Sequence, residues 1–160
     1  MVGMRTGYSV IDAMSTRPVT VRPESTLQEA AALMHENDVG SLVVRREEQL
    51  LGILTEYDLV RKGVREALDM TRVNVADIMT RDLVTVSPKM DVFDALRVMM
   101  EADVRHLPVL DEGKLVGFLT VKDVLAIQPQ LYELIVEKLA TAQRRTRKEE
   151  FDEEFAEESF

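Results

Sequence analysis

Short apolar runs and polar clusters alternate along most of the chain, and their periods predict both strands and helices. The β-branched runs "PVTV" at 18–21 and "LVTV" at 83–86 predict short strands, and a proline follows each. Two later segments have apolar residues at the 3.6-residue spacing of a helix. They are Leu27, Ala30, Ala31 and Met34 in one segment, and Val92, Ala95, Leu96 and Met99 in the other. Each predicted helix therefore has one apolar face that needs a partner surface.

Each of these helices is followed by two apolar runs with a polar turn between them. The segments "SLVVRREEQLLGILT" and "HLPVLDEGKLVGFLT" predict hairpins with turns at 46–49 and 111–114. Ser25 or Thr26 is the expected N-cap of the first amphipathic helix, and Asp91 is that of the second. Short helical leads, "VIDAM" and "VADIM", are predicted before the first strands.

The second half of this pattern repeats the first. Residues 10–60 align with 75–125 without a gap, and more than a third of the paired residues are identical. Chance alone would match roughly one pair in fifteen to twenty, so the chain contains an internal duplication. Each copy is predicted to fold as strand, helix, strand, strand, helix, an α/β arrangement of the α+β class. A copy of about fifty residues buries too little apolar area to fold alone. We therefore expect the two copies to pack sheet face to sheet face about an approximate two-fold axis.

Each copy ends its hairpin in the same motif, "GILTEYD" in the first and "GFLTVKD" in the second. Thr55 and Thr120 end a strand and open a helix, so their hydroxyls can cap it, and Asp58 and Asp123 can complete the cap. The same geometry suits a ligand. Backbone N–H groups at a helix start attract anions, and a carboxylate accepts hydrogen bonds from the paired hydroxyls of a ribose. Capping and binding are compatible, and packing of the copies would create one cleft beside each motif.

Composition changes this picture mainly at the C-terminus. The 160-residue chain has no cysteine, which excludes disulfides, thiolate zinc sites and a cysteine nucleophile. Its net charge of −9 is concentrated in "EEFDEEFAEESF" at 149–160, because the rest of the chain has 22 acidic against 20 basic residues. A body so balanced has no overall field to attract nucleic acid. Spacing predicts an amphipathic helix over 128–147, and an acidic, disordered tail over 148–160.

No apolar run approaches the ~18 residues of a membrane span, and the N-terminus lacks the charged and apolar order of a secretory signal. We therefore expect a cytoplasmic protein that does not interact with membranes.

The order and spacing of the motifs resemble a tandem pair of CBS (cystathionine-β-synthase-type) domains, also called a Bateman module. The matching segments are "DAM" and "DIM" with "VTV", "DVGSLVV" and "DVRHLPVLD", and the two Thr-x-x-Asp motifs. The resemblance implies CBS repeats at 8–62 and 74–127 with a linker at 63–73, each repeat a β-α-β-β-α unit in a pseudo-two-fold pair. It also implies that two modules associate into a disc, so we expect a homodimer. Many members bind AMP, ADP, ATP or S-adenosylmethionine in the clefts, and in others the clefts are empty.

The resemblance assigns the ribose to the two aspartates, and related modules supply a basic residue for phosphate from the opposite copy. Arg105 and His106 stand where the first copy has Gly40 and Ser41, so only one cleft is well equipped for phosphate. Because strand residues alternate in direction, at most one of Arg105 and His106 faces that cleft, and the other lies on the surface or in an interface. The residues expected at the first cleft are Thr55, Asp58, Arg105 and His106, with Thr80, Arg81, Leu83 and Val84 as its wall.

The second cleft has weaker provision for phosphate and is expected to prefer a less charged adenosyl ligand or to stay empty. Its residues are Thr120 and Asp123, with Lys122 near the phosphates and Thr16, Arg17, Pro18 and Val19 as the wall. His35 is predicted to be exposed, with no ligand partner at useful spacing. We predict no metal site and no catalytic cofactor.

These features favour a regulatory module without chemistry of its own, which senses AMP, ADP or ATP and acts on an unidentified protein partner. CBS pairs also occur as inserts in IMP dehydrogenase and other enzymes, but this chain has no phosphate loop of the P-loop type and no Ser–His–Asp set. The alternatives are a sensor of S-adenosylmethionine and a module that binds nucleic acid through "RRTRK" at 144–148. The nucleic-acid alternative lacks a clustered aromatic and basic surface.

Overall fold

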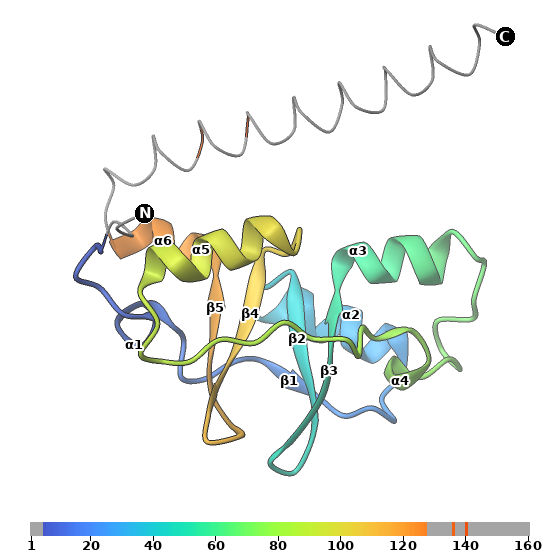
Figure 1. Ribbon diagram of the computed structural model, residues 1–160. Helices are drawn as coiled ribbons and strands as arrows, with labels where there is room; N and C mark the ends of the chain where they lie inside the picture. Colours follow the sequence, from blue (N-terminus) through green and yellow to red (C-terminus); the bar gives the residue numbers. More distant parts are fainter. Residues whose placement is uncertain (1–4, 128–135, 137–139, 141–160) are drawn as a thin grey trace, which may run out of the picture.

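The structure is a computed structural model that describes residues 5–127, 136 and 140. Within the first of these ranges the chain forms two similar halves, each with a hairpin and helices, that lie side by side (Figure 1). Apart from positions 136 and 140, the helix predicted over 128–147 lies outside the described residues, as does the tail predicted over 148–160.

The helices and strands follow the predicted order in both halves, except that the first strand predicted for the second half, over 83–86, is reduced to an isolated bridge. The first half consists of α1 (Val10–Ala13), β1 (Thr20–Val21), α2 (Leu27–Glu36), β2 (Ser41–Arg46), β3 (Gln49–Thr55), α3 (Glu56–Asp58) and the π-helical segment η1 (Leu59–Val64). The second half consists of α4 (Val75–Ile78), α5 (Val92–Glu101), β4 (His106–Asp111), β5 (Lys114–Thr120) and α6 (Val121–Ile127). The predicted α+β fold of two related halves is therefore confirmed.

The two amphipathic helices begin at side-chain caps and bury their predicted apolar faces. Of the two candidates Ser25 and Thr26, it is Thr26 that caps α2, where its hydroxyl accepts from the Glu29 N–H at 3.2 Å. Asp91 caps α5 by accepting from the Phe93 N–H at 2.8 Å. The buried residues of these helices are Leu27, Ala30 and Met34 in α2, and Val92, Ala95, Leu96 and Met99 in α5.

The first strand of the second half is much shorter than predicted. In the first half β1 pairs in parallel with β2, and the Val43 N–H donates to the Val19 carbonyl at 3.0 Å. In the second half this pairing shrinks to an isolated bridge between Val86 and Val109. Pro108 occupies the position of Val43 and has no N–H, so the equivalent hydrogen bond cannot form. The sequence contained this signal, because a proline interrupts the run "HLPV".

The short leads α1 and α4 exchange places between the halves. Beyond α1, Ser15 pairs with Phe118 of β5 through two hydrogen bonds of 2.9 Å. Beyond α4, Thr80 pairs with Ile53 of β3 through hydrogen bonds of 2.9 and 3.0 Å. Val10 of α1 is consequently buried in the core of the second half, whereas α4 contributes to the core of the first (Figure 1). Each hairpin therefore carries a strand-like segment from the other half.

A separate apolar cluster lies where the two sheets face each other. Val43 and Ile53 of the first half meet Phe118 of the second, and Leu50, Leu83 and Leu115 pack around them. This cluster confirms the predicted sheet-to-sheet packing. The halves are thus joined twice, by the facing sheets and by the exchanged leads.

Candidate functional site

Both Thr-x-x-Asp motifs form the predicted helix cap. At the start of α3 the Asp58 N–H donates to Thr55 Oγ1 at 3.0 Å, and the Thr55 N–H donates to Asp58 Oδ2 at 3.1 Å. At the start of α6 the Asp123 N–H donates to Thr120 Oγ1 at 3.3 Å, and the Thr120 N–H donates to Asp123 Oδ2 at 2.8 Å. Each pair satisfies two backbone donors that a helix start leaves without partners.

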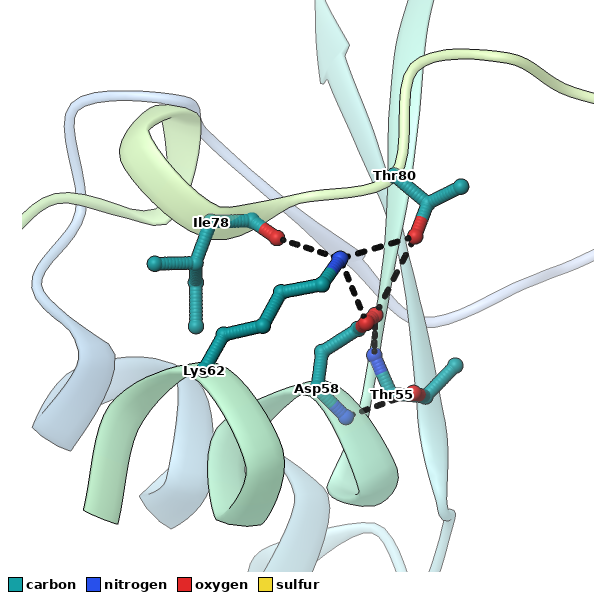
Figure 2. A network of polar contacts seen from close by, with 5 residues as sticks. All are labelled: Thr55, Asp58, Lys62, Ile78 and Thr80. Carbon is teal, nitrogen blue, oxygen red and sulfur yellow. Dashed lines mark hydrogen bonds and ion pairs between the residues drawn. The ribbon is translucent and has the colours of Figure 1, made fainter. Parts of the chain in front are cut away.

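Among the described residues, Asp58 has partners beyond the cap, whereas Asp123 has none. It is only 5% exposed and is the one buried charged residue in the described part of the chain. The Lys62 ammonium lies 2.9 Å from Asp58 Oδ1, and the Thr80 hydroxyl donates to Oδ2 at 3.5 Å, the outer limit of a hydrogen bond (Figure 2). Because Thr80 belongs to the exchanged lead, the Asp58 carboxylate lies where the two halves meet.

We call this cluster the Asp58 half-site and define it by Thr55, Asp58, Lys62, Thr80 and the carbonyl group of Ile78. Lys62 donates to that carbonyl at 3.2 Å and to Thr80 Oγ1 at 3.5 Å (Figure 2). Sequence reasoning missed Lys62 and Ile78. The signal for the lysine was its place one helical turn after Asp58, but only the fold shows that it also contacts the lead of the other half.

The Asp123 half-site consists of Thr120 and Asp123. Ser15 of the other exchanged lead pairs with Phe118, which lies two residues before Thr120 in β5. Ile127 stands at the position that aligns with Lys62. Asp123 is only partly buried, and no ion pair to it occurs among the residues that the structure describes. The two half-sites share the cap and differ in charge.

The glycine in each motif makes room for an exchanged lead. A Cβ atom at Gly52 would lie 2.7 Å from the Thr80 carbonyl oxygen and 2.8 Å from Met79 Sδ, both closer than real contacts allow. A Cβ atom at Gly117 would meet the side chain of Met14. These glycines therefore permit the close approach that holds Thr80 beside Asp58 and places Ser15 at the corresponding point of β5. The sequence showed the two glycines, but only the exchange of leads explains them.

Of the two basic residues from the second half, His106 interacts with Asp58. It is partly buried at the start of β4, where its ring stacks on Phe118 with the centroids 5.8 Å apart. Burial lowers the pKa of His106, the Asp58 carboxylate opposes that shift, and Arg105 adds to it. Arg105 itself is exposed. The two neighbouring residues therefore differ in exposure, as alternation along a strand allows.

The residues expected as the wall of the first cleft have different surroundings. Leu83 packs against the apolar cluster between the sheets, and Val84 is 38% exposed. Arg81 is exposed and donates to the Ala76 carbonyl at 2.9 Å. Leu83 and Val84 thus offer apolar surface on the segment that follows Thr80, whereas the Arg81 guanidinium is engaged by its own lead.

The residues expected around the second cleft are mostly on the surface. Thr16, Arg17 and Lys122 are exposed, and Pro18 and Val19 are partly buried. Val19 also accepts the backbone hydrogen bond of β2 and packs against the core of the first half. In the part of the chain that the structure describes, no hydrogen bond joins the side chains of 16–19 to Asp123.

An open depression of about 620 Å³ lies elsewhere, beside the start of α5. Arg5, Lys89 and Asp91 are among its lining residues, and none of its lining residues belongs to either half-site. The Asp91 carboxylate already accepts hydrogen bonds from Thr6 and from the Phe93 N–H. The depression has mixed charge and no buried polar group without a partner, so we place the candidate site at the half-sites.

Comparison with known families identifies the family to which this fold belongs. The model of the CBS domain matches residues 10–65 and again 75–129. The chain belongs to the CBS domain family. It contains two CBS repeats in tandem, as the sequence resemblance implied, and the exchanged leads are the first residues of the two matched ranges.

Individual CBS proteins resemble the chain over the same region. An uncharacterised protein of Methanopyrus kandleri, MK0525, is 37% identical over 76% of this chain, which spans 63% of the length of that relative. An uncharacterised conserved protein of Pyrococcus horikoshii has a similar crystal structure, with a TM-score of 0.72, 34% identity, and coverage of 78% of this chain and 94% of that one. The crystal structure of CBSX2 in complex with AMP matches with a TM-score of 0.66 and 31% identity, over 79% of this chain and 99% of the other.

Two further observations apply only to the described residues. They contain no group of three or more His, Asp or Glu side chains placed to hold a metal ion. They also contain no helix that is both long and apolar enough to cross a membrane.

Proposed function

We propose that this CBS pair is a non-catalytic regulatory module that binds an adenosine nucleotide, AMP, ADP or ATP, beside its aspartates. The proposal is carried by the Asp58 half-site, in which a buried carboxylate and a lysine ammonium meet at the junction of the two halves. A carboxylate suits ribose hydroxyls, and a nearby cation suits phosphate. The structure of CBSX2, which is 31% identical and was solved with AMP, supports this class of ligand.

Each residue of the first cleft has a chemical role in this proposal. Asp58 accepts hydrogen bonds from the ribose, with Thr55 holding the helix start beside it. Arg105 of the second half supplies positive charge towards the phosphates, and the partly buried His106, whose pKa is lowered by burial, offers a ring N–H as a neutral hydrogen-bond donor. Leu83 and Val84 offer apolar surface to the adenine base, in the segment that begins with Thr80 and Arg81.

Binding at this place gives a route to signalling. Asp58 belongs to the first half, whereas Thr80 and His106 belong to the second. A ligand that contacts both sides stabilises the relative arrangement of the halves that fits it best, and it shifts an equilibrium only if its affinity differs between arrangements. A protein partner in the cytoplasm then binds the altered arrangement, or the altered oligomeric state, differently.

Isothermal titration of the full chain with AMP, ADP, ATP and S-adenosylmethionine tests this function. We expect saturable heat with at least one of the three nucleotides. The absence of binding by all four compounds, for protein shown to be folded by circular dichroism, would refute the proposal.

The Asp123 half-site supports a second candidate ligand. Because no cation pairs with Asp123 in the described chain, this half-site suits an adenosyl compound without phosphate, such as S-adenosylmethionine. Competition between AMP and S-adenosylmethionine distinguishes the sites. Independent saturation by both compounds supports two different ligand classes, and mutual displacement with one site in total refutes this assignment.

An exposed apolar face on α3 and η1 supports the proposed homodimer. Tyr57, Val60 and Val64 are 64%, 59% and 64% exposed, and they recur every three to four residues along the helix. Light scattering coupled to size-exclusion chromatography measures the effect of Val60→Glu. We expect the variant to be monomeric at concentrations at which the original chain is a dimer, and a wild-type chain that is monomeric throughout would refute the homodimer.

A further inference from the structure

Lys62 contacts both halves of the molecule at the Asp58 half-site. Its ammonium lies 2.9 Å from Asp58 Oδ1, and it donates to the Ile78 carbonyl at 3.2 Å and to Thr80 Oγ1 at 3.5 Å (Figure 2). An ammonium has three N–H donors, so these contacts use its full capacity. The lysine neutralises a buried carboxylate and ties the helix of the first half to the exchanged lead of the second.

Helix capping does not require this lysine. Asp123 exchanges the same two hydrogen bonds with Thr120, although Ile127 stands at the position equivalent to Lys62. The two carboxylates also differ in burial. Asp58, which has the lysine, is buried, and Asp123, which has Ile127 in its place, is only partly buried. Lys62 is therefore an addition to the shared cap that occurs at one half-site.

A ribose would compete with Lys62 for the same carboxylate oxygen. Asp58 Oδ2 already accepts from the Thr55 N–H and the Thr80 hydroxyl, whereas Oδ1 accepts from Lys62. Two ribose hydroxyls that donate to one carboxylate need Oδ1 as well. A neutral nucleoside would therefore displace the ammonium from Oδ1 and break its ion pair with the buried carboxylate without supplying another anion in its place, which is unfavourable.

A phosphate group would remove this penalty. The Lys62 side chain is 46% exposed, and its ammonium is at the end of a flexible four-carbon stem, so it can turn from Asp58 to an anion that enters with the ribose. In such a complex the ribose hydroxyls would contact Asp58 and the phosphate would contact Lys62. Both charges would then keep hydrogen-bonded partners.

We infer that Lys62 determines ligand choice at the Asp58 half-site, which accepts a phosphate-bearing adenosine and discriminates against the unphosphorylated nucleoside. This inference rests on the proposed adenosine ligand and adds to it the residue that selects for phosphate. The Asp123 half-site, with Ile127 in the equivalent position, does not have this selection.

The test compares AMP with adenosine by isothermal titration of the full chain and two variants. Lys62→Met removes the ammonium, and Lys62→Gln removes the charge but keeps an N–H donor for Asp58, so that at least one variant retains a partner for the buried carboxylate. We expect the ratio of AMP to adenosine affinity to fall by about 10- to 100-fold in both variants, since hydrogen bonds to charged groups are worth that factor. Adenosine affinity should stay constant or rise.

Lys114→Met is the matched control. Lys114 is an exposed lysine at the start of β5, in the turn of the second hairpin, and it belongs to neither half-site. Its loss removes the same charge from the protein and should leave the affinity ratio unchanged. Thermal unfolding of each variant records whether the fold persists.

The possible results separate the two proposals. An equal loss of affinity for AMP and adenosine, or no change for either, would show that Lys62 is only a structural ion pair; the inference would then fail while the proposed function stands. If the wild-type chain binds neither compound nor any other adenosine nucleotide, the proposed function fails and the inference fails with it. A fall in the ratio in both lysine variants, without a fall in the control, supports the inference.

Discussion

The two half-sites have the same local structure and different chemistry. In each, a threonine and an aspartate close a helix cap at the end of a hairpin, and an exchanged lead lies along the strand before it. Among the residues that the structure describes, Asp58 is buried and paired with a lysine whereas Asp123 is neither, and the Asp58 charge opposes the lowering of the His106 pKa. A duplication that preserved the cap thus allowed the charges around it to diverge.

This difference separates the residues that both copies share from those that one copy adds, and we propose that the shared ones serve the fold and the added ones distinguish a ligand. The glycine, threonine and aspartate are common to both copies because the cap and the close approach of the lead require them. Lys62 and His106 have no equivalent in the other copy, where Ile127 and Ser41 stand. The shared residues can therefore be tested by their effect on stability, and the unshared ones by their effect on binding.

The largest expected difference between the half-sites concerns nucleotide affinity. Asp58→Asn keeps an oxygen that can accept the capping hydrogen bond but removes the charge, so AMP affinity should fall by about 10- to 100-fold. Asp123→Asn is the matched substitution and should leave the affinity of the tighter AMP site within about 3-fold, less than the loss of one such hydrogen bond. Isothermal titration measures both. A stronger effect at Asp123 would reverse the assignment of the phosphate-binding cleft.

The glycines provide the next largest contrast. In Gly52→Ala the new methyl group meets the backbone oxygen of Thr80, which cannot move without shifting the lead, so we expect a loss of about 1–3 kcal/mol in the free energy of unfolding. In Gly117→Ala it meets the flexible side chain of Met14, and the loss should stay below about 1 kcal/mol. Urea unfolding measures both values. Equal losses would indicate that the two leads approach their hairpins alike.

A smaller effect is expected from restoring the missing strand pairing of the second half. Pro108→Val supplies the N–H that Val43 provides in the first half, which should lengthen the parallel pairing around Val86. The gain of one hydrogen bond, partly offset by a more flexible unfolded chain, should raise the free energy of unfolding by about 0.5 kcal/mol. Hydrogen exchange followed by NMR should show a protected amide at position 108, comparable with that of Val43. A rapidly exchanging amide there would contradict this explanation of the short strand.

The smallest expected effect is a dependence of stability on pH at His106. Burial lowers the pKa of this side chain below its ordinary value of 6.5, so the unfolded chain binds the proton more readily than the folded one. The stabilising contribution is therefore complete above pH 6.5 and is lost as the pH falls through the lower pKa of the folded state.

Replacement of each histidine isolates this effect. His106→Gln should flatten the change of unfolding free energy between pH 7 and pH 5, about the range below the ordinary histidine pKa. His35→Gln, at an exposed position on α2, should leave the change as it is in the original chain. An unchanged slope in His106→Gln would show that another group is responsible.

Much of the local structure could be predicted from the sequence. The helical spacing of Leu27 to Met34 identified α2 and its buried face, and the polar turns located both hairpins. These predictions succeed because the periods of helices and strands depend on neighbouring residues. The prediction of a full first strand in the second half was wrong, because Pro108 on the neighbouring strand has no N–H to donate to it.

The candidate site was predicted only in part. Thr55 and Asp58 could be named from a repeated motif, and Thr80 lies close to them, as expected for the first cleft. Lys62 was missed because its contacts to Ile78 and Thr80 depend on a lead that comes from the other half. The different exposure of His106 and Arg105 likewise depends on the direction of β4, which sequence alternation limits but does not assign.

The sequence by itself determined a duplicated α+β chain with two helix caps, because capping and periodicity act over a few residues. Only the tertiary structure decided that the leads cross between the halves, that Gly52 must lack a side chain, and that Asp58 is buried beside Lys62. These features arise from contacts between segments far apart in the chain. They depend on how two sheets and two leads pack against each other, which the local sequence pattern of each segment does not determine.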